Sequence, residues 1–201
     1  MNAAITDTIV YRYKQSLYLN ITNSCTNECV FCIKKFSKGV GKYDLRLKMQ
    51  VTKEKILSEI NKEINLDDKE IVFCGYGEPL TRFDTVIDVI KAIKIKYPSI
   101  KVRINTNGHA NLIYPNRNIA KNLSDAGLDS ISISLNSENS KKYFEICNPK
   151  FGIKSYDEVL KFIKECKKYI KVVYISIVEG YADTLECKKK ADELGCKFKI
   201  R

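Results

Sequence analysis

The sequence predicts an α/β protein with a parallel sheet. Six short strand-like segments alternate with segments whose apolar residues recur at helical spacing. Helical patterns of about 10 to 15 residues between strands are typical of right-handed βαβ units. The unusual polar residues and cysteines follow the strand-like segments, as expected where parallel strands end at one edge. Six units are too few for a closed eight-stranded barrel, which leaves an open partial barrel or a doubly wound sheet.

The first predicted strand covers residues 16–22, "SLYLNIT", in which apolar and polar side chains alternate. A helix is predicted over 51–64, with an apolar stripe and Thr52 as its N-cap. The remaining elements are strand 70–74, helix 84–97, strand 101–105, helix 118–126, strand 130–135, helix 156–169, strand 171–178, helix 184–194 and strand 197–200. Pro98, Gly127 and Gly195 follow the ends of three of these helices.

Length and composition favour one globular domain over residues 1–201, because a chain of this size buries a substantial core. The N-terminus lacks the pattern of a signal peptide, and no run of about 18 uncharged apolar residues occurs. We therefore expect a cytoplasmic protein without membrane contact. The net charge is +11, with a basic concentration at residues 34–48. A solvated surface explains this charge most simply, and attraction to a polyanion, an anionic cofactor or an acidic redox partner are the alternatives.

Three cysteines, Cys25, Cys29 and Cys32, lie within eight residues directly after the first strand. Structural zinc sites usually take four ligands in two pairs, and no second pair occurs in this sequence. A [4Fe–4S] cluster has four irons, and cysteine thiolates are its usual protein ligands. Three cysteines would leave one iron without a protein ligand. A small molecule could bind that iron, just as a water or substrate binds the open position of a catalytic zinc site. We therefore expect an iron–sulfur site with an exogenous ligand.

The segment "CTNECVFC", residues 25–32, resembles the CxxxCxΦC motif of the radical SAM superfamily, with Phe31 at the aromatic position. This resemblance implies a partial (β/α)6 TIM-like barrel. It also implies that S-adenosylmethionine binds the open iron through its amine and carboxylate. In that family, reductive cleavage of S-adenosylmethionine gives a 5′-deoxyadenosyl radical, which abstracts a hydrogen atom from the substrate.

Further motifs extend the resemblance to cofactor contacts. "CGYGEPL" is similar to the family's GGEP element and implies roles for Tyr76, Gly77 and Glu78 around the ammonium group. "NTNG" and "SLNS" resemble third- and fourth-strand motifs, and they imply contacts from Asn105, Thr106, Ser134 and Asn136. "YISIVEGY" departs from the fifth-strand GxIxGxxE motif, which puts the adenine contacts in doubt.

Nearly the full chain is similar to the short TatD-linked radical SAM subfamily, which identifies no substrate. Cys147 lies in "EICNPKFG", which we interpret as an irregular segment near the substrate entrance, and it is our candidate catalytic residue. His109 follows the "NTNG" turn, where it could face the cavity. Burial in the core is expected for Cys74, Cys166 and Cys187.

The leading functional hypothesis is a radical SAM enzyme with an unidentified substrate. A carboxydeazaguanine synthase-like or glycyl-radical activating enzyme is the alternative within the superfamily. A basic RNA-binding or RNA-modifying module, motivated by the charge, and a structural zinc domain are alternatives from other classes. A flavodoxin- or ferredoxin-type reductant is expected to dock at Lys34, Lys35 and Lys38. Because the sequence stops at Arg201, we expect a large substrate, even a macromolecule, or a partner subunit to cover the rim of the barrel.

Overall fold

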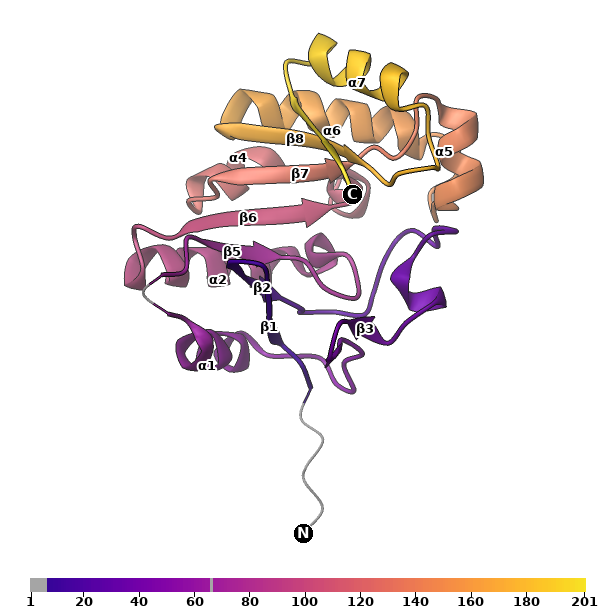
Figure 1. Ribbon diagram of the computed structural model, residues 1–201. Coiled ribbons are helices and arrows are strands. Elements are labelled where there is room, and N and C mark those ends of the chain that lie inside the picture. The colour runs from indigo at the N-terminus through magenta and orange to yellow at the C-terminus, as the bar shows by residue number, and fades with distance from the viewer. Residues whose placement is uncertain (1–6, 66) are drawn as a thin grey trace.

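The computed structural model describes residues 7–65 and 67–201, and a seven-stranded sheet forms its centre (Figure 1). The strands are β1 (Val10–Tyr13), β2 (Ser16–Leu19), β5 (Glu70–Phe73), β6 (Lys101–Thr106), β7 (Ser130–Ser134), β8 (Val172–Ile177) and β9 (Lys197–Ile200), in this spatial order. From β2 to β9 all neighbours pair in parallel, whereas β1 pairs antiparallel with β2. The six predicted parallel strands are confirmed.

The spatial order of the strands decides between the two architectures. A doubly wound sheet reverses its strand order at a switch point, which places helices on both faces. Here the order follows the chain without reversal. Right-handed crossovers then place successive helices on the same side, where α2, α4 and α6 lie behind the sheet in Figure 1. The fold is therefore of the partial-barrel type, and the doubly wound alternative is wrong.

The five predicted helices form close to their predicted bounds. They are α1 (Lys53–Glu63), α2 (Phe83–Lys96), α4 (Ile119–Asp125), α6 (Ser155–Tyr169) and α7 (Thr184–Glu193). The Thr52 hydroxyl accepts a hydrogen bond from the Lys55 amide at 3.2 Å, which confirms the predicted N-cap. One hydrophobic core extends from Ile9 to Cys196 between the helices and the sheet. Within the described residues, no helix is long and apolar enough to cross a membrane.

Several short elements have no counterpart in the prediction: β1, the hairpin of β3 (Gly39–Val40) and β4 (Tyr43–Asp44), the 3-10 turns η1 (Ile33–Lys35) and η2 (Pro79–Arg82), α3 (Ala110–Ile113) and α5 (Ser140–Cys147). The turn between β1 and β2 carries none of the glycine signals of a tight hairpin, and Lys14 adopts a φ of 54°. The interpretation of the segment around Cys147 as irregular is wrong. Asn139 caps α5 through the Lys142 amide at 2.9 Å, and Cys147 is its last residue.

The two faces of the sheet differ in character. Ile71, Ile104 and Ile133 point into the core beneath the helices. The residues between such positions lie on the opposite face, because side chains alternate along a strand. We call this the open face; it carries Tyr18, Arg103, Asn105, Ser132, Ser134, Tyr174, Ser176, Lys197 and Lys199. The open face is therefore polar, and it leads to the carboxyl ends of the strands.

Candidate cluster and cofactor site

A cavity of about 330 Å³ lies where the six parallel strands end, and we call it the cysteine hollow. It brings together all the predicted cluster and cofactor residues: Cys25, Cys29, Phe31, Cys32, Tyr76, Gly77, Glu78, Asn105, Thr106, Ser134 and Asn136. Asn27, Ile33, Cys74, Gly75, Asn107, Val178 and Arg201 complete its lining, which does not include Cys147. Residues up to about 180 positions apart thus meet in one place because parallel strands end at the same edge.

The cysteine loop, residues 20–32, is held against the end of α5 by backbone hydrogen bonds. The amides of Glu28 and Val30 donate to the carbonyls of Cys147 at 3.1 Å and Ile146 at 2.8 Å. The amide of Lys150 donates to the Thr26 carbonyl at 2.8 Å. The last carbonyls of a helix have no partner inside it, and here the cysteine loop supplies two of the missing donors.

The glycines of "GYGEP" allow the β5 turn to approach the cysteine loop closely. A Cβ atom on Gly77 would come within 2.6 Å of the Thr22 carbonyl oxygen, and one on Gly75 would come within 2.6 Å of the Asn20 Cα. Neither glycine has a positive φ. These glycines are therefore required for close contact between two loops and not for an unusual turn conformation.

Asn20 joins the same two loops through its side chain. Its amide donates to the carbonyls of Thr8 and Leu45, each at 2.8 Å, and its oxygen accepts from the Tyr76 amide at 2.9 Å. Asn20 is fully buried. Sequence reasoning missed this residue, although a single asparagine in an apolar strand end is a signal for a buried hydrogen-bonding centre.

The Glu78 carboxylate is used by hydrogen bonds within the protein. It accepts from the Leu80 amide at 2.9 Å, the Thr106 hydroxyl at 2.8 Å and the Asn107 amide at 2.6 Å. Burial raises the pKa of Glu78 to about 7, against the opposing effect of these donors. Glu78 therefore ties the β5 turn to the end of β6.

A buried polar chain fastens the cysteine loop to β6 and α5. The Asn107 side-chain oxygen accepts from the His109 amide at 3.1 Å, which turns its NH₂ group toward the Thr26 hydroxyl at 2.8 Å. The Thr26 hydroxyl lies 2.9 Å from His109 Nδ1, and His109 Nε2 lies 2.9 Å from the Tyr143 hydroxyl. Burial lowers the pKa of His109 to about 4, so the ring is neutral at pH 7. His109 is fully buried and does not line the cysteine hollow.

The environments of the cluster cysteines differ. Burial, reinforced by the charge of Glu78, raises the pKa of Cys25 to about 11. A hydrogen bond from the Cys147 thiol lowers the pKa of Cys29, although burial opposes it. The Asn107 NH₂ group lies 3.8 Å from the Cys25 sulfur. Each of these two sulfurs therefore has a donor that would stabilise a thiolate.

These residues fit an iron–sulfur cluster. Cys25, Cys29 and Cys32 line one cavity together with Asn136, whose buried side-chain oxygen has no partner among the described residues. The cavity volume lies in the range of about 300 to 1,000 Å³ typical of small-molecule sites. Within residues 7–65 and 67–201, no three Cys, His, Asp or Glu side chains converge on a single metal ion. A multi-atom cluster accommodates thiols that are spread around a cavity, and cysteine is its usual ligand.

Two further cysteines lie next to the site. The thiol of Cys74 is half-buried and lines the cysteine hollow, so the expectation that it is simply a core residue is wrong. Cys147 is fully buried, and its sulfur accepts from the Asn136 NH₂ group at 3.7 Å. Cys147 thus supports Cys29 and Asn136 and lies away from the cavity surface. Cys166 and Cys187 are buried as expected.

The remaining predicted cofactor residues line the cysteine hollow from three sides. The Phe31 ring lies 4.9 Å from that of Tyr181, and the Tyr76 hydroxyl donates to the Ser37 carbonyl at 3.1 Å. The Asn105 oxygen accepts from Arg103 at 2.7 Å. Ser134 accepts from Arg201 at 2.5 Å, which adds a cation that the sequence motifs did not indicate.

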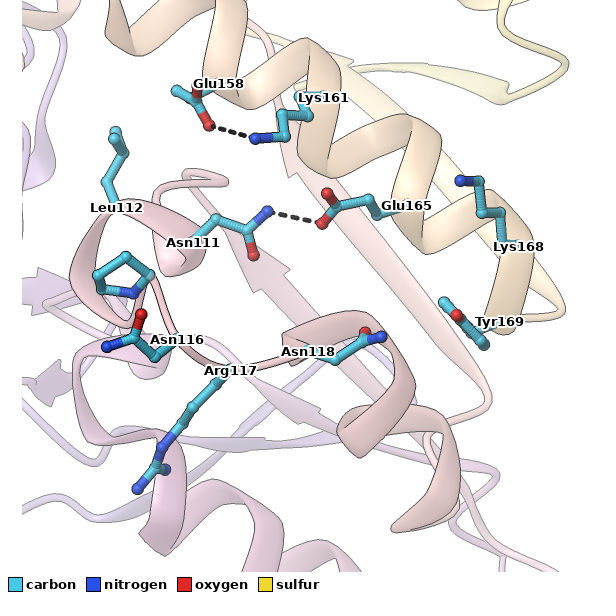
Figure 2. Close-up of a pocket in the computed structure, with 11 residues that line it drawn as sticks. Asn111, Leu112, Asn116, Arg117, Asn118, Glu158, Lys161, Glu165, Lys168 and Tyr169 are labelled. Carbon is cyan, nitrogen blue, oxygen red and sulfur yellow. Dashed lines mark hydrogen bonds and ion pairs between the residues drawn. The ribbon is translucent and has the colours of Figure 1, made fainter.

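A larger groove of about 690 Å³ lies away from this site, between the segment 111–118 and α6 (Figure 2). Figure 2 shows Asn111 pointing at Glu165, 2.6 Å away, and Glu158 paired with Lys161 at 3.7 Å. We call it the helix groove. None of the predicted site residues lines it.

Comparisons with known proteins match this picture. The sequence model of the family described as "Radical SAM superfamily" matches residues 19–194. A probable GTP 3′,8-cyclase of Thermococcus kodakarensis is 28% identical over 170 residues, which are 84% of this chain and 49% of that protein. A probable GTP 3′,8-cyclase of Methanocaldococcus jannaschii is 32% identical over 160 residues, which are 79% of this chain and 46% of that protein. The chain spans about half the length of these curated relatives.

Solved structures show the same fold. SuiB of Streptococcus suis superposes with a TM-score of 0.63 at 20% identity, covering 88% of this chain and 37% of that one. Methylornithine synthase (PylB) superposes with a TM-score of 0.64 at 12% identity, covering 92% of this chain and 52% of that one.

Proposed function

The chain belongs to the radical SAM superfamily, and we propose that it is an enzyme that uses a 5′-deoxyadenosyl radical to abstract a hydrogen atom from its substrate. Members of this superfamily use a [4Fe–4S] cluster and S-adenosylmethionine, and the bound cluster supplies the electron that cleaves the cofactor. The observation that carries the proposal is the cysteine hollow, where three free thiols and eight predicted cofactor residues meet.

In this proposal, the cluster is bound by Cys25, Cys29 and Cys32. Contacts elsewhere in the protein fix the positions of these three side chains. The end of α5 and the buried chain through Thr26 and His109 fix the cysteine loop before any cofactor binds. Such preorganisation matters because the reacting atoms must meet within a few tenths of an ångström.

The other lining residues would bind S-adenosylmethionine. Asn136 is 3% exposed, and its side-chain oxygen has no donor among the described residues. A buried acceptor without a partner costs about 1–3 kcal/mol, and a hydroxyl or ammonium group of the cofactor would remove that cost. The Phe31 ring offers an apolar surface, and the Gly77 backbone is free of a side chain.

Anaerobic reconstitution with iron and sulfide tests the proposal. The expected product is a brown protein with about four irons and four sulfides per chain. Dithionite and S-adenosylmethionine should then release 5′-deoxyadenosine. A colourless protein that binds zinc and no iron would overturn the proposal in favour of the structural zinc alternative.

Cys74 provides a matched control, because it lines the same cavity and is also a cysteine. Cys25→Ala should lose most of the iron, whereas Cys74→Ala should keep it. Loss of iron in Cys74→Ala would make Cys74 a fourth protein ligand, and the cluster would then have no open iron for S-adenosylmethionine.

GTP is the first substrate to test, because the curated relatives compared above are named GTP 3′,8-cyclases. The substrate is otherwise open, and a carboxydeazaguanine synthase-like or glycyl-radical activating reaction stays an alternative. A mass-spectrometric search for deuterium transferred from a labelled substrate into 5′-deoxyadenosine would identify the molecule that loses the hydrogen.

An acidic flavodoxin- or ferredoxin-type protein is the proposed reductant, attracted by the basic segment 34–48. Lys34 contacts the Asn23 carbonyl and lies 5.4 Å from the centre of the Tyr76 ring, and Lys35 lies 3.4 Å from the Glu28 carbonyl oxygen. Substituting these two lysines would therefore disturb the cysteine loop. The double variant Lys38→Gln/Lys42→Gln is the cleaner test, and we expect slower reduction at low ionic strength. An unchanged rate would exclude docking at this segment.

A further inference from the structure

Strand β9 presents a row of positive charges on the open face. Lys197, Lys199 and Arg201 alternate with Phe198 and Ile200, and Phe198 packs against the core. Because side chains alternate along a strand, the three cations share the other face, about 6.6 Å apart from one to the next. We call these three residues the cation row. Its last member, Arg201, lines the cysteine hollow.

The cation row has no acidic partner. No Asp or Glu of the described residues lies within ion-pair distance of Lys197, Lys199 or Arg201. Arg103 on the same open face differs, because it holds Glu70 through two nitrogens at 3.0 and 2.9 Å. Partial burial and the charges of Arg103 and Arg201 lower the pKa of Lys199, against the opposing charge of Glu70, which lies beyond ion-pair distance.

The nearest strand neighbours of the cation row on β7 and β8 are polar and uncharged, and the next charges on the open face are the paired Arg103 and Glu70. Arg201 donates to the Ser134 hydroxyl, and Ser176 lies beside Lys199 in the strand register. The Lys197 ammonium lies 5.8 Å from the centre of the Tyr174 ring. Three adjacent cations repel one another, and a bound anion with several charges relieves that repulsion. Arginine and serine also offer directed hydrogen bonds to phosphate oxygens.

We propose that the cation row binds the anionic group of the substrate, and that the substrate is a small molecule with two or more adjacent negative charges, such as a diphosphate ester. The inference rests on the proposed function, because it places the anion on β9 and the reacting carbon toward the cysteine hollow. An edge strand rich in lysine also resists pairing with other chains, but that role alone predicts no specific anion binding.

Inorganic pyrophosphate is the probe, titrated by calorimetry into the reconstituted protein saturated with S-adenosylmethionine. We expect one site per chain that weakens as ionic strength rises. Lys199→Gln and Lys197→Gln should each weaken binding about tenfold, which corresponds to about 1.4 kcal/mol. Lys199→Arg keeps the charge and should stay within about threefold of the unsubstituted protein. Lys171→Gln, at the opposite end of the sheet, is the charge-matched control and should bind normally.

Three results would overturn the inference. The first is equal pyrophosphate affinity in Lys199→Gln, Lys197→Gln and the unsubstituted protein, with thermal unfolding showing that the variants are folded. The second is displacement of S-adenosylmethionine by pyrophosphate, because the row would then serve the cofactor carboxylate. The third is row-dependent binding of a single-stranded RNA without binding of pyrophosphate.

Failure of the inference can be distinguished from failure of the proposed function. Release of 5′-deoxyadenosine by the unsubstituted protein tests the function without reference to the cation row. If that reaction occurs and pyrophosphate does not bind, only the inference falls. If pyrophosphate binds through the row and no cleavage occurs, the proposed function falls, and the row is an anion site that does not serve a radical reaction.

Discussion

The cysteine hollow and the helix groove differ in size and in the kinds of side chain that line them. The helix groove is about twice as large, at about 690 Å³ against about 330 Å³. Its lining residues come from helices and their connections, and its acidic groups are engaged with neighbours on the groove wall. The cysteine hollow takes its lining from the ends of six parallel strands and holds free thiols and an unpartnered amide oxygen.

An unpartnered buried amide oxygen occurs in both cavities, at Asn136 in the cysteine hollow and at Asn111 in the helix groove, so the three free thiols, and not size, mark the cysteine hollow as the functional cavity. Charged side chains on a helix surface are solvated, and their pairs contribute little to stability. Cysteine thiolates gathered in one cavity are the usual protein ligands of an iron–sulfur cluster. The following predictions test this contrast, beginning with the largest expected effect.

Gly77→Ala should disrupt the cysteine hollow most strongly. Its new Cβ would approach the carbonyl oxygens of Ser24 and Thr22, so the cysteine loop must move away. We expect about 3 kcal/mol of lost stability and loss of most of the iron after reconstitution.

Gly152→Ala is the control for this change. Gly152 has a φ of 77° with open space around it, so alanine there costs only backbone strain, about 1 kcal/mol. Iron content should stay normal. Equal iron content in the Gly77 and Gly152 variants would show that close approach of the two loops is not needed for the cluster.

His109 should make stability depend on pH. Its folded-state pKa of about 4 lies below the ordinary value of 6.5. On acidification, the unfolded chain therefore binds a proton at His109 before the folded protein does. The contribution of neutral His109 to the free energy of unfolding is fully present above pH 6.5 and is lost as the pH falls toward 4. The loss attributable to His109 is about 3 kcal/mol. Denaturant unfolding of the unsubstituted protein and His109→Gln from neutral to acid pH measures it.

The His109→Gln variant should be less stable than the unsubstituted protein at neutral pH, because the contacts of residue 109 with Thr26 and Tyr143 change. The free energy of unfolding of the variant should also fall less steeply on acidification. Parallel pH profiles for the two proteins would contradict a neutral, buried His109.

Cys147→Ala should have a moderate effect. The substitution removes a thiol that donates to Cys29 and accepts from Asn136, and it leaves a small cavity at the end of α5. We expect about 1–2 kcal/mol of lost stability with full iron content, because the three predicted ligands remain. Iron loss comparable to that of Cys25→Ala would instead make Cys147 a cluster ligand.

Glu165→Gln in the helix groove should have the smallest effect. Glu165 accepts from Asn111 at 2.6 Å at a partly exposed position, and glutamine can still accept there. A change within about 0.5 kcal/mol and unchanged cofactor cleavage are expected. Loss of cleavage in this variant would assign the groove a functional role that its chemistry does not indicate.

The repeating part of the fold could be predicted from sequence because each βα unit carries its own periodic pattern. Thr52 and Gly127 mark helix boundaries through local chemistry alone. Strand β1 could not be predicted because its short turn to β2 carries no glycine signal, and helix α5 could not be predicted because the contact that holds its end comes from distant residues. The amides of Glu28 and Val30 bond to the end of α5, and no local pattern around residue 147 indicates that contact.

The residues of the site could be predicted, but the physical roles of several could not. Motif spacing predicts that Glu78 lies in the cofactor site, whereas its donors from Thr106 and Asn107 appear only when β5 and β6 are paired. Asn20 and Arg201 were missed because each acts through partners from other strands. A sequence pattern identifies the type of residue at each position, whereas the pairing of the strands determines which other residues it contacts.

The seam between the cysteine loop and α5 sets an order of events during synthesis. Asn27 reaches Tyr143, 116 positions later in the chain. A ribosome adding about 5–20 residues per second needs roughly ten seconds to make that interval. The cysteine loop leaves the exit tunnel long before the residues of α5 that bind its backbone have been synthesised. The cysteine side chains of the nascent chain are therefore exposed to solvent during that interval. The cysteine loop can therefore reach its final position only after α5 has been synthesised.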